Sequence, residues 1–132
     1  MEKVKIVARY LDGKTIKGFT QDFFPNKPGF HIFPLDAPHE SVRILLEELK
    51  AVFFVRDFTG KPEYDERKQF TPEERPSGRI VEVTFADGEV LVGSTVSYDP
   101  KRPVFFIFPA DPQSNNARMF ALSKAVRTVR YL

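Results

Sequence analysis

The chain of 132 residues contains no cysteine and no tryptophan, and its formal net charge is only +2. The absence of cysteine excludes disulfides, thiolate metal sites and a cysteine nucleophile. The charge is too small for the strongly basic face expected of a nucleic-acid-binding domain. No apolar run approaches the ~18 residues of a membrane-spanning helix. The first residues alternate like a strand rather than a signal peptide, so we expect a cytoplasmic protein with no membrane partner.

Sequence signals for catalysis are also missing. The two histidines, His31 and His39, are not spaced as a pair of zinc ligands. Neither a phosphate-binding Gly-x-x-x-x-Gly-Lys loop nor a Gly-x-Ser-x-Gly nucleophile elbow occurs. We therefore predict a protein that is not an enzyme and has no catalytic residues, no metal site and no cofactor.

The feature that is present is an internal repeat. One constant shift of 75 positions aligns eleven identical residues between positions 12–36 and 87–111. They are residues of turns and strand interiors: Asp12/Asp87, Gly13/Gly88, Gly18/Gly93, Thr20/Thr95, Pro25/Pro100, Pro28/Pro103, Phe30/Phe105, Ile32/Ile107, Phe33/Phe108, Pro34/Pro109 and Asp36/Asp111. A fixed period indicates a duplicated architecture. We predict one copy at 1–57, a charged proline-containing linker at 58–79 and a second copy at 80–132.

Each copy has the pattern of a small β domain. Asp12-Gly13 and Asp87-Gly88 each lie between two β-prone runs, which predicts a hairpin with a type I′ turn and positive φ at both central residues. A glycine inside the second strand, Gly18 or Gly93, predicts a bend that closes a barrel or a close approach by another backbone.

The end of each copy is predicted by a second match. Lys50-Ala51-Val52 aligns with Lys124-Ala125-Val126 at a shift of 74, and Arg43 and Arg118 fall on equivalent strands. The broken alternation of the valines around these motifs predicts a short helical turn leading into a last strand.

The third strand of each copy, Phe30–Phe33 or Phe105–Phe108, is apolar on both faces. A strand of this kind is covered on both sides. One face should fill its own barrel and the other should meet the sister copy or another subunit. Phe33, Phe106 and Phe108 are therefore candidate interface residues.

The run Asp87-Gly88-Glu89-Val90-Leu91-Val92-Gly93 resembles the start of the Sm-like proteins, and Asp12 to Gly18 matches with Ile16 in place of leucine. The order of strands and turns is similar to SH3-like and Sm-like small barrels in general. The resemblance implies an all-β fold of two tandem five-stranded barrels, packed as a pseudo-symmetric pair. Pro25-x-x-Pro28 replaces the RNA-binding loop of the Sm-like family, so that family's RNA-binding residues do not carry over.

A second resemblance concerns Arg75-Pro76-Ser77-Gly78-Arg79, which is similar to the Arg-x-x-x-Arg stretch of PilZ domains. That resemblance implies binding of cyclic di-GMP through Arg75 and Arg79, whose guanidiniums can bind phosphates bidentately and stack on purines. The family's second motif, Asp/Asn-x-Ser-x-x-Gly, is absent.

The proline loops carry cations beside aromatic residues: Lys27 in the first copy, and Lys101 and Arg102 in the second. Basic residues next to stacking platforms bind single-stranded nucleic acid. The alternative is that the prolines stiffen a loop whose cations are solvated. The sequence favours a non-enzymatic binding or assembly module for protein–protein association or self-association. A cyclic-dinucleotide sensor and an Sm-like nucleic-acid-binding protein are the alternatives.

Overall fold

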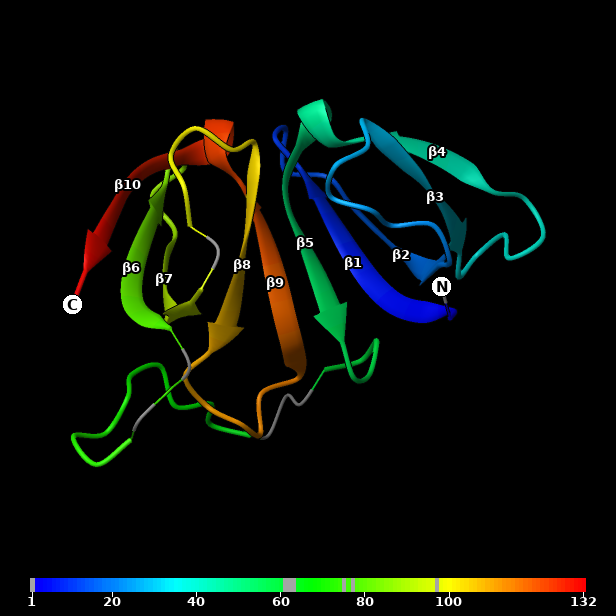
Figure 1. The fold of residues 1–132 in the computed structure, drawn as a ribbon. Helices are drawn as coiled ribbons and strands as arrows, with labels where there is room; N and C mark the ends of the chain where they lie inside the picture. Colours follow the sequence, from blue (N-terminus) through cyan, green and yellow to red (C-terminus); the bar gives the residue numbers. More distant parts are fainter. Residues whose placement is uncertain (1, 61–63, 75, 77, 97) are drawn as a thin grey trace.

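The computed structural model describes residues 2–60, 64–74, 76, 78–96 and 98–132, and it is almost entirely β (Figure 1). Ten antiparallel strands form one open sheet, and two short 3-10 turns interrupt the chain. The elements are β1 Val4–Tyr10, β2 Thr15–Thr20, β3 Gly29–Pro34, β4 Val42–Leu45, η1 Leu46–Glu48, β5 Leu49–Val55, β6 Arg79–Phe85, β7 Val90–Thr95, β8 Val104–Pro109, β9 Asn116–Leu122, η2 Ser123–Ala125 and β10 Val126–Tyr131. Among the described residues, no helix is long and apolar enough to cross a membrane.

The strand order is β10-β6-β7-β8-β9-β5-β1-β2-β3-β4. Each half of the chain therefore has the same internal order, and the last strand of the first half, β5, pairs with the fourth strand of the second half, β9. Figure 1 shows β5 and β9 side by side in the middle, with β10 and β4 on opposite sides. The all-β class is confirmed. Closure of two separate barrels stays a prediction, because strand pairing joins both halves in one open sheet.

The Asp-Gly hairpins are present, but their predicted turn type is wrong. Gly13 and Gly88 have φ of 92° and 97°, and no non-glycine residue among those described has positive φ. Gly13 N–H donates to Tyr10 O at 3.0 Å, and the Asp12 carboxylate accepts from Lys14 N–H at 2.9 Å. The turn thus uses glycine alone for the left-handed position, while the aspartate stabilises the loop through its side chain.

Glycine inside the second strand allows the close approach expected of it. A Cβ atom at Gly18 would lie 2.2 Å from the carbonyl oxygen of Phe33, and one at Gly93 would lie 2.3 Å from that of Phe108. The third strand crosses the second at these points, so any side chain would force the two backbones apart.

The shift between the halves is not constant, and this corrects two predicted equivalences. Phe30 pairs with Ile44, whereas its counterpart Phe105 pairs with Ala121, so the second half has two more residues between its third and fourth strands. From this point the shift is 77 rather than 74 or 75. The two 3-10 turns agree with a shift of 77, since Leu46 N–H donates to Pro28 O and Ser123 N–H donates to Pro103 O.

With this register, the structural counterpart of Lys50 is Arg127 and not Lys124. Each is the residue skipped at a bulge in the pairing with the first strand of its half. The counterpart of Arg43 is Phe120 and not Arg118, because Arg43 pairs with β3 where Phe120 pairs with β8. The predicted helical turn before each last strand is confirmed as η1 and η2.

Candidate functional site

The two halves meet at the seam between β5 and β9, which is the most buried part of the sheet. Val52 pairs with Phe120 and Phe53 pairs with Met119, and these side chains are at most 6% exposed. Side chains of successive residues point to opposite faces of a strand. The seam therefore has one face, with Val52 and Phe120, that fills the core of the first half, and an opposite face, with Phe53 and Met119, that points into the second half.

An aromatic cluster occupies the first of these faces. Phe23 lies 4.9 Å from Phe30 and 5.4 Å from Phe54 between ring centroids, and Phe120 from the second half lies 4.7 Å from Phe23. Tilted and edge-to-face ring pairs each contribute about 0.5–1.5 kcal/mol beyond their buried area. A residue of the second half thus completes the core of the first.

A charge cluster joins the halves at one end of the seam. Lys50 is only 8% exposed, and its Nζ donates to Asp87 at 2.7 Å and also to Glu89. Arg9 lies 3.6 Å from Glu89 and 5.0 Å from the centroid of the Phe53 ring. Asp87, which the sequence explains by turn chemistry alone, therefore also holds the two halves together.

The electrostatics of this cluster follow from its hydrogen bonds. Burial opposes the charged form of Lys50, yet the bonds to Asp87 and Glu89 outweigh it and raise the pKa of the amine. The bond from Lys50 and the Glu89 backbone N–H hold the pKa of Asp87 below its usual range. Both groups are charged at neutral pH, as an ion pair requires.

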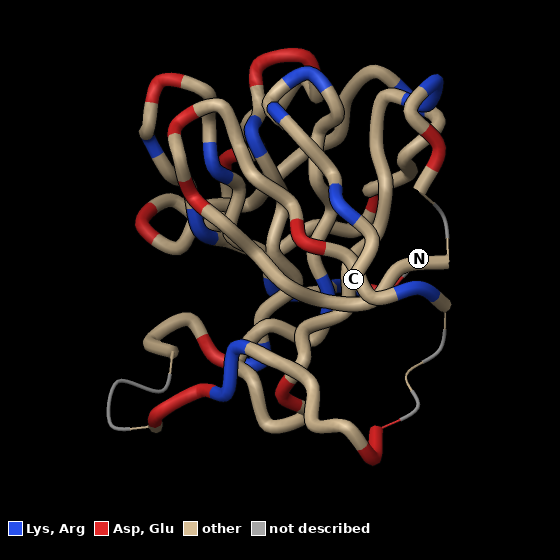
Figure 2. The backbone as a smooth tube through the Cα atoms, turned by 90° about the vertical axis from the view of Figure 1, so that its left-hand side faces the viewer, with Lys and Arg blue, Asp and Glu red and all other residues tan. Residues whose placement is uncertain are grey.

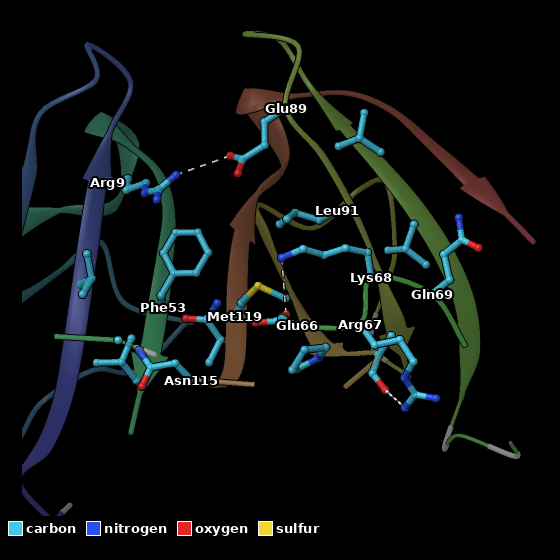
Figure 3. A pocket seen from close by; sticks show the side chains of 18 of the residues that line it. Arg9, Phe53, Glu66, Arg67, Lys68, Gln69, Glu89, Leu91, Asn115 and Met119 are labelled. Carbon is cyan, nitrogen blue, oxygen red and sulfur yellow. Dashed lines mark hydrogen bonds and ion pairs between the residues drawn. The ribbon is translucent and has the colours of Figure 1, made fainter. Parts of the chain in front are cut away.

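The face of the seam that points into the second half forms the floor of an open pocket of about 740 Å³ (Figure 3). Phe53, Leu91 and Met119 line it, the Arg9–Glu89 pair lies at one rim, and residues 66–69 from the segment between the halves form another. The pocket is thus built from β-strands of both halves and from the part of the chain that is not repeated.

The segment 64–74 lies within the predicted linker and is bonded to the second half. Asp111 accepts hydrogen bonds from the Tyr64 hydroxyl at 2.5 Å and from the N–H groups of Arg67 at 3.0 Å and Gln113 at 2.8 Å. These bonds, led by the one from Tyr64, lower the pKa of Asp111 to about 2. Arg67 in turn donates to both carboxylate oxygens of Glu74 and to Ala110 O.

Charges at the pocket occur in pairs of opposite sign, such as Arg67–Glu74 and Lys68–Glu66, and Figure 2 shows both signs interspersed along the chain. Within the part of the chain that the structure describes, no group of three or more His, Asp or Glu side chains could hold a metal ion.

The basic proline loops are partly brought together. Lys27 lines one pocket of about 500 Å³ and Arg102 lines a neighbouring one of about 470 Å³, and the two share Pro25, Asn26 and Pro103 as walls. Lys27 also lies 5.1 Å from the centroid of Phe24, a ring that is 40% exposed. Lys101 is not among the lining residues of either pocket.

The candidate interface phenylalanines have different surroundings. Phe106 is half-buried against Phe120, Phe33 is half-buried opposite Phe19, and Phe108 is exposed and stacked on Phe106. Their role as an interface stays a prediction. For the cyclic-dinucleotide alternative, Arg75 lies outside the described residues, and the Arg79 guanidinium lies 4.0 Å from the centroid of Tyr131.

Sequence reasoning missed Lys50 and Tyr131. The signal for Lys50 was present, since it is the one charged residue in the otherwise apolar run 49–55. Tyr131 could not be singled out, because its correspondence to Phe54 depends on the shift of 77 that only the pairing of the strands reveals.

Comparison with known proteins places the chain in a family but assigns it no activity. Neither a curated protein nor a solved structure matches it. The profile of one family matches residues 2–132, nearly the whole chain. The chain therefore belongs to the family of unknown function DUF6982.

Proposed function

We propose that this chain is a non-enzymatic assembly module that associates with other protein chains through the edges of its sheet. The observation that carries the proposal is the seam itself: the two halves associate by pairing an edge strand of one with an edge strand of the other. The outer strands β4 and β10 have no pairing partner on their outward side among the described residues.

The architecture behind this proposal is a duplicated unit. We infer that residues 1–57 and 80–132 are copies of one five-stranded small-barrel unit of SH3-like or Sm-like type, packed as a pseudo-symmetric pair. The equal strand order, the two glycine turns and the two glycine crossings support the duplication. In such a pair, the last strand of one half and the fourth strand of the other meet at the seam. The other last strand and the other fourth strand are then left at the two ends of the sheet.

The chemistry of the outer edges suits selective pairing. An exposed edge strand offers unpaired N–H and C=O groups, and natural proteins limit aggregation with short strands and charged side chains. β4 has four residues and includes the exposed Arg43, while β10 carries Arg127 and Arg130. A partner must therefore match these charges as well as the strands.

Site-specific photo-crosslinking in the cells that make the protein tests the proposal. A photoreactive amino acid replaces Arg43 in β4 or Thr128 in β10, and the matched control replaces the exposed Glu73 outside the sheet. We expect discrete protein adducts from the two edge positions and none from position 73. Adducts that are absent at both edges, or equally abundant at position 73, would contradict edge-mediated association.

A second candidate function, binding of single-stranded nucleic acid, is favoured by the adjoining pockets that Lys27 and Arg102 line beside Phe24. Fluorescence anisotropy with a labelled oligonucleotide should then show affinity that falls steeply between 50 and 200 mM salt, in the manner of phosphate contacts. Lys27→Gln and Arg102→Gln should weaken binding, whereas Lys68→Gln should not. A flat salt response would rule this candidate out.

A further inference from the structure

We propose that the partner at these edges is a second copy of this chain, with β4 of one copy pairing with β10 of the next in the register that joins β9 to β5. This inference rests on the proposed edge-mediated association and names its partner. It follows from the shift of 77 between the halves, by which β10 is the counterpart of β5 and β4 is the counterpart of β9.

The register of the outer pairing can be derived from the seam. Ala51 pairs with Ala121 and Val52 pairs with Phe120. Their counterparts place Thr128 of one copy opposite Ile44 of the next. Val129 then faces Arg43 in the same way.

The side-chain environment of the seam also recurs at the outer edge. In the first half, Phe23 packs on Phe30 and Phe54, and Phe120 completes the cluster. The counterparts of the first three are Tyr98, Phe105 and Tyr131, which have the same contacts, with centroid separations of 4.9 Å and 6.3 Å from Tyr98.

At the outer edge, no described residue of another half occupies the position that Phe120 fills at the seam. Shallow pockets of about 110 and 310 Å³ both include Tyr98 in their linings, and the Tyr131 residue is 46% exposed. The counterpart of Phe120 is Arg43, exposed on β4. A guanidinium packs well on a tyrosine face, and Arg79 already lies over Tyr131 in this way.

The charge pair of the seam has a counterpart as well. Lys50 binds Asp87 at the seam, and the equivalent residues are Arg127 on β10 and Asp12 in the first hairpin. The Asp12 side chain is 59% exposed, and Arg127 now donates to Ala86 O on its own half. These two side chains should form an ion pair between copies.

A second difference, besides Arg43 in place of Phe120, makes the outer contact weaker than the seam. Lys14 stands where Glu89 stands in the second half, so it repels Arg127 where Glu89 attracts Lys50. Because the two edges differ, the contact is head-to-tail, and it generates a ring if the rotation between copies closes and a filament if it does not. The association should therefore be reversible and dependent on concentration.

Sedimentation velocity of the full chain over a range of concentrations tests the inference. We expect Arg43→Phe and Lys14→Glu each to lower the dissociation constant about threefold to tenfold, because each restores a residue type found at the seam. Tyr131→Ser should cancel the gain from Arg43→Phe. The control is Glu73→Phe, which places a phenylalanine at an exposed position outside the sheet and should have no effect.

Engineered cysteines provide a second readout, because the natural chain contains none. A Val129→Cys protein mixed with an Arg43→Cys protein should form a disulfide heterodimer under mild oxidation. A mixture of Glu73→Cys, an exposed position outside the sheet, with Arg43→Cys should not. Both measurements remain informative if one variant fails to fold.

The results separate the two levels of the proposal. A chain that stays monomeric in every variant, with edge-specific photo-adducts of another protein, overturns the second-copy inference and leaves edge-mediated association standing. Monomers together with no edge adducts overturn both. Equal tightening by Glu73→Phe would show nonspecific hydrophobic association and would also overturn the second-copy inference.

Discussion

Lys50 shows how one residue can be assigned the wrong role by local similarity. The Lys-Ala-Val motif that Lys50 shares with Lys124 predicts that the two lysines are structurally equivalent. However, Lys50 is buried between the halves and Lys124 is exposed. A buried amine is stable only when its hydrogen bonds are satisfied. The turn of the other half supplies them, so this contact couples the fold of one half to the other.

Lys50→Gln should reduce the free energy of unfolding by about 1–3 kcal/mol, because the hydrogen bonds from the charged amine to Asp87 and Glu89 are lost. Chemical denaturation followed by circular dichroism measures this, with Lys124→Gln as the matched control that should change little. The pKa of Lys50 is raised on folding, so the contribution is complete below the unfolded pKa of about 10.4 and lost as pH rises through the folded pKa. Equal losses in the two variants would contradict the assignment.

Asp111 should make stability sensitive to acid. Its pKa is about 2 in the folded chain, against about 3.9 when unfolded. The contribution is therefore present above pH ~4 and lost as pH falls towards 2. Asp111→Asn should lower the thermal midpoint of unfolding at pH 7, and the difference from the natural chain should shrink at pH 2–3. Asp36→Asn changes the exposed counterpart of Asp111 and should leave the thermal midpoint unchanged. A deficit that is independent of pH would argue against the role of the charge.

At the scale of the element, glycine acts in two different ways. Gly93 lets β8 cross β7 in close contact, whereas Gly88 provides a left-handed turn in open space. We expect Gly93→Ala to cost about 2–4 kcal/mol through backbone clash and Gly88→Ala about 1–2 kcal/mol through its φ alone. Hydrogen exchange should show loss of protection at β7 and β8 in Gly93→Ala. The reverse ranking would contradict this account.

Strand-level structure was largely predictable from the sequence. The Asp-Gly pairs, the Phe-rich third strands and the short helical turns are local signals, and each is where it was expected. The predicted type I′ turn was wrong because the Asp12 side chain stabilises a different loop, in which only the glycine has positive φ. The predicted equivalence of Lys50 with Lys124 was wrong because the second half has two extra residues between its third and fourth strands. A Lys-Ala-Val motif that recurs nearby by coincidence hides this insertion in the sequence.

The candidate site was less predictable than the strands. Lys27 and Arg102 were identified, and they do line neighbouring pockets. The large pocket at the seam was not, because it depends on which strand of one half pairs with which strand of the other. That choice is made by long-range contacts such as Phe120 on Phe23, which have no signature in local periodicity.

The whole molecule should unfold as one unit, because the aromatic core of the first half includes Phe120 from the second. Phe120→Ala should lower the free energy of unfolding by about 3–5 kcal/mol and keep a single transition by both circular dichroism and tyrosine fluorescence. Phe108→Ala, at an exposed position, is the control and should cost far less. Two separate transitions in the natural chain would show that the halves are independent.

The identical strand order of the halves has a consequence for how such chains can change in length. Each half begins and ends its sheet with the same kinds of edge, so adding a further half in tandem buries one old edge and creates one of the same kind. A covalent fusion of two whole chains would therefore expose the same two terminal strands as a single chain. A longer chain of this kind would keep the same two terminal strands, while each added contact would use the weaker pairing of β4 with β10.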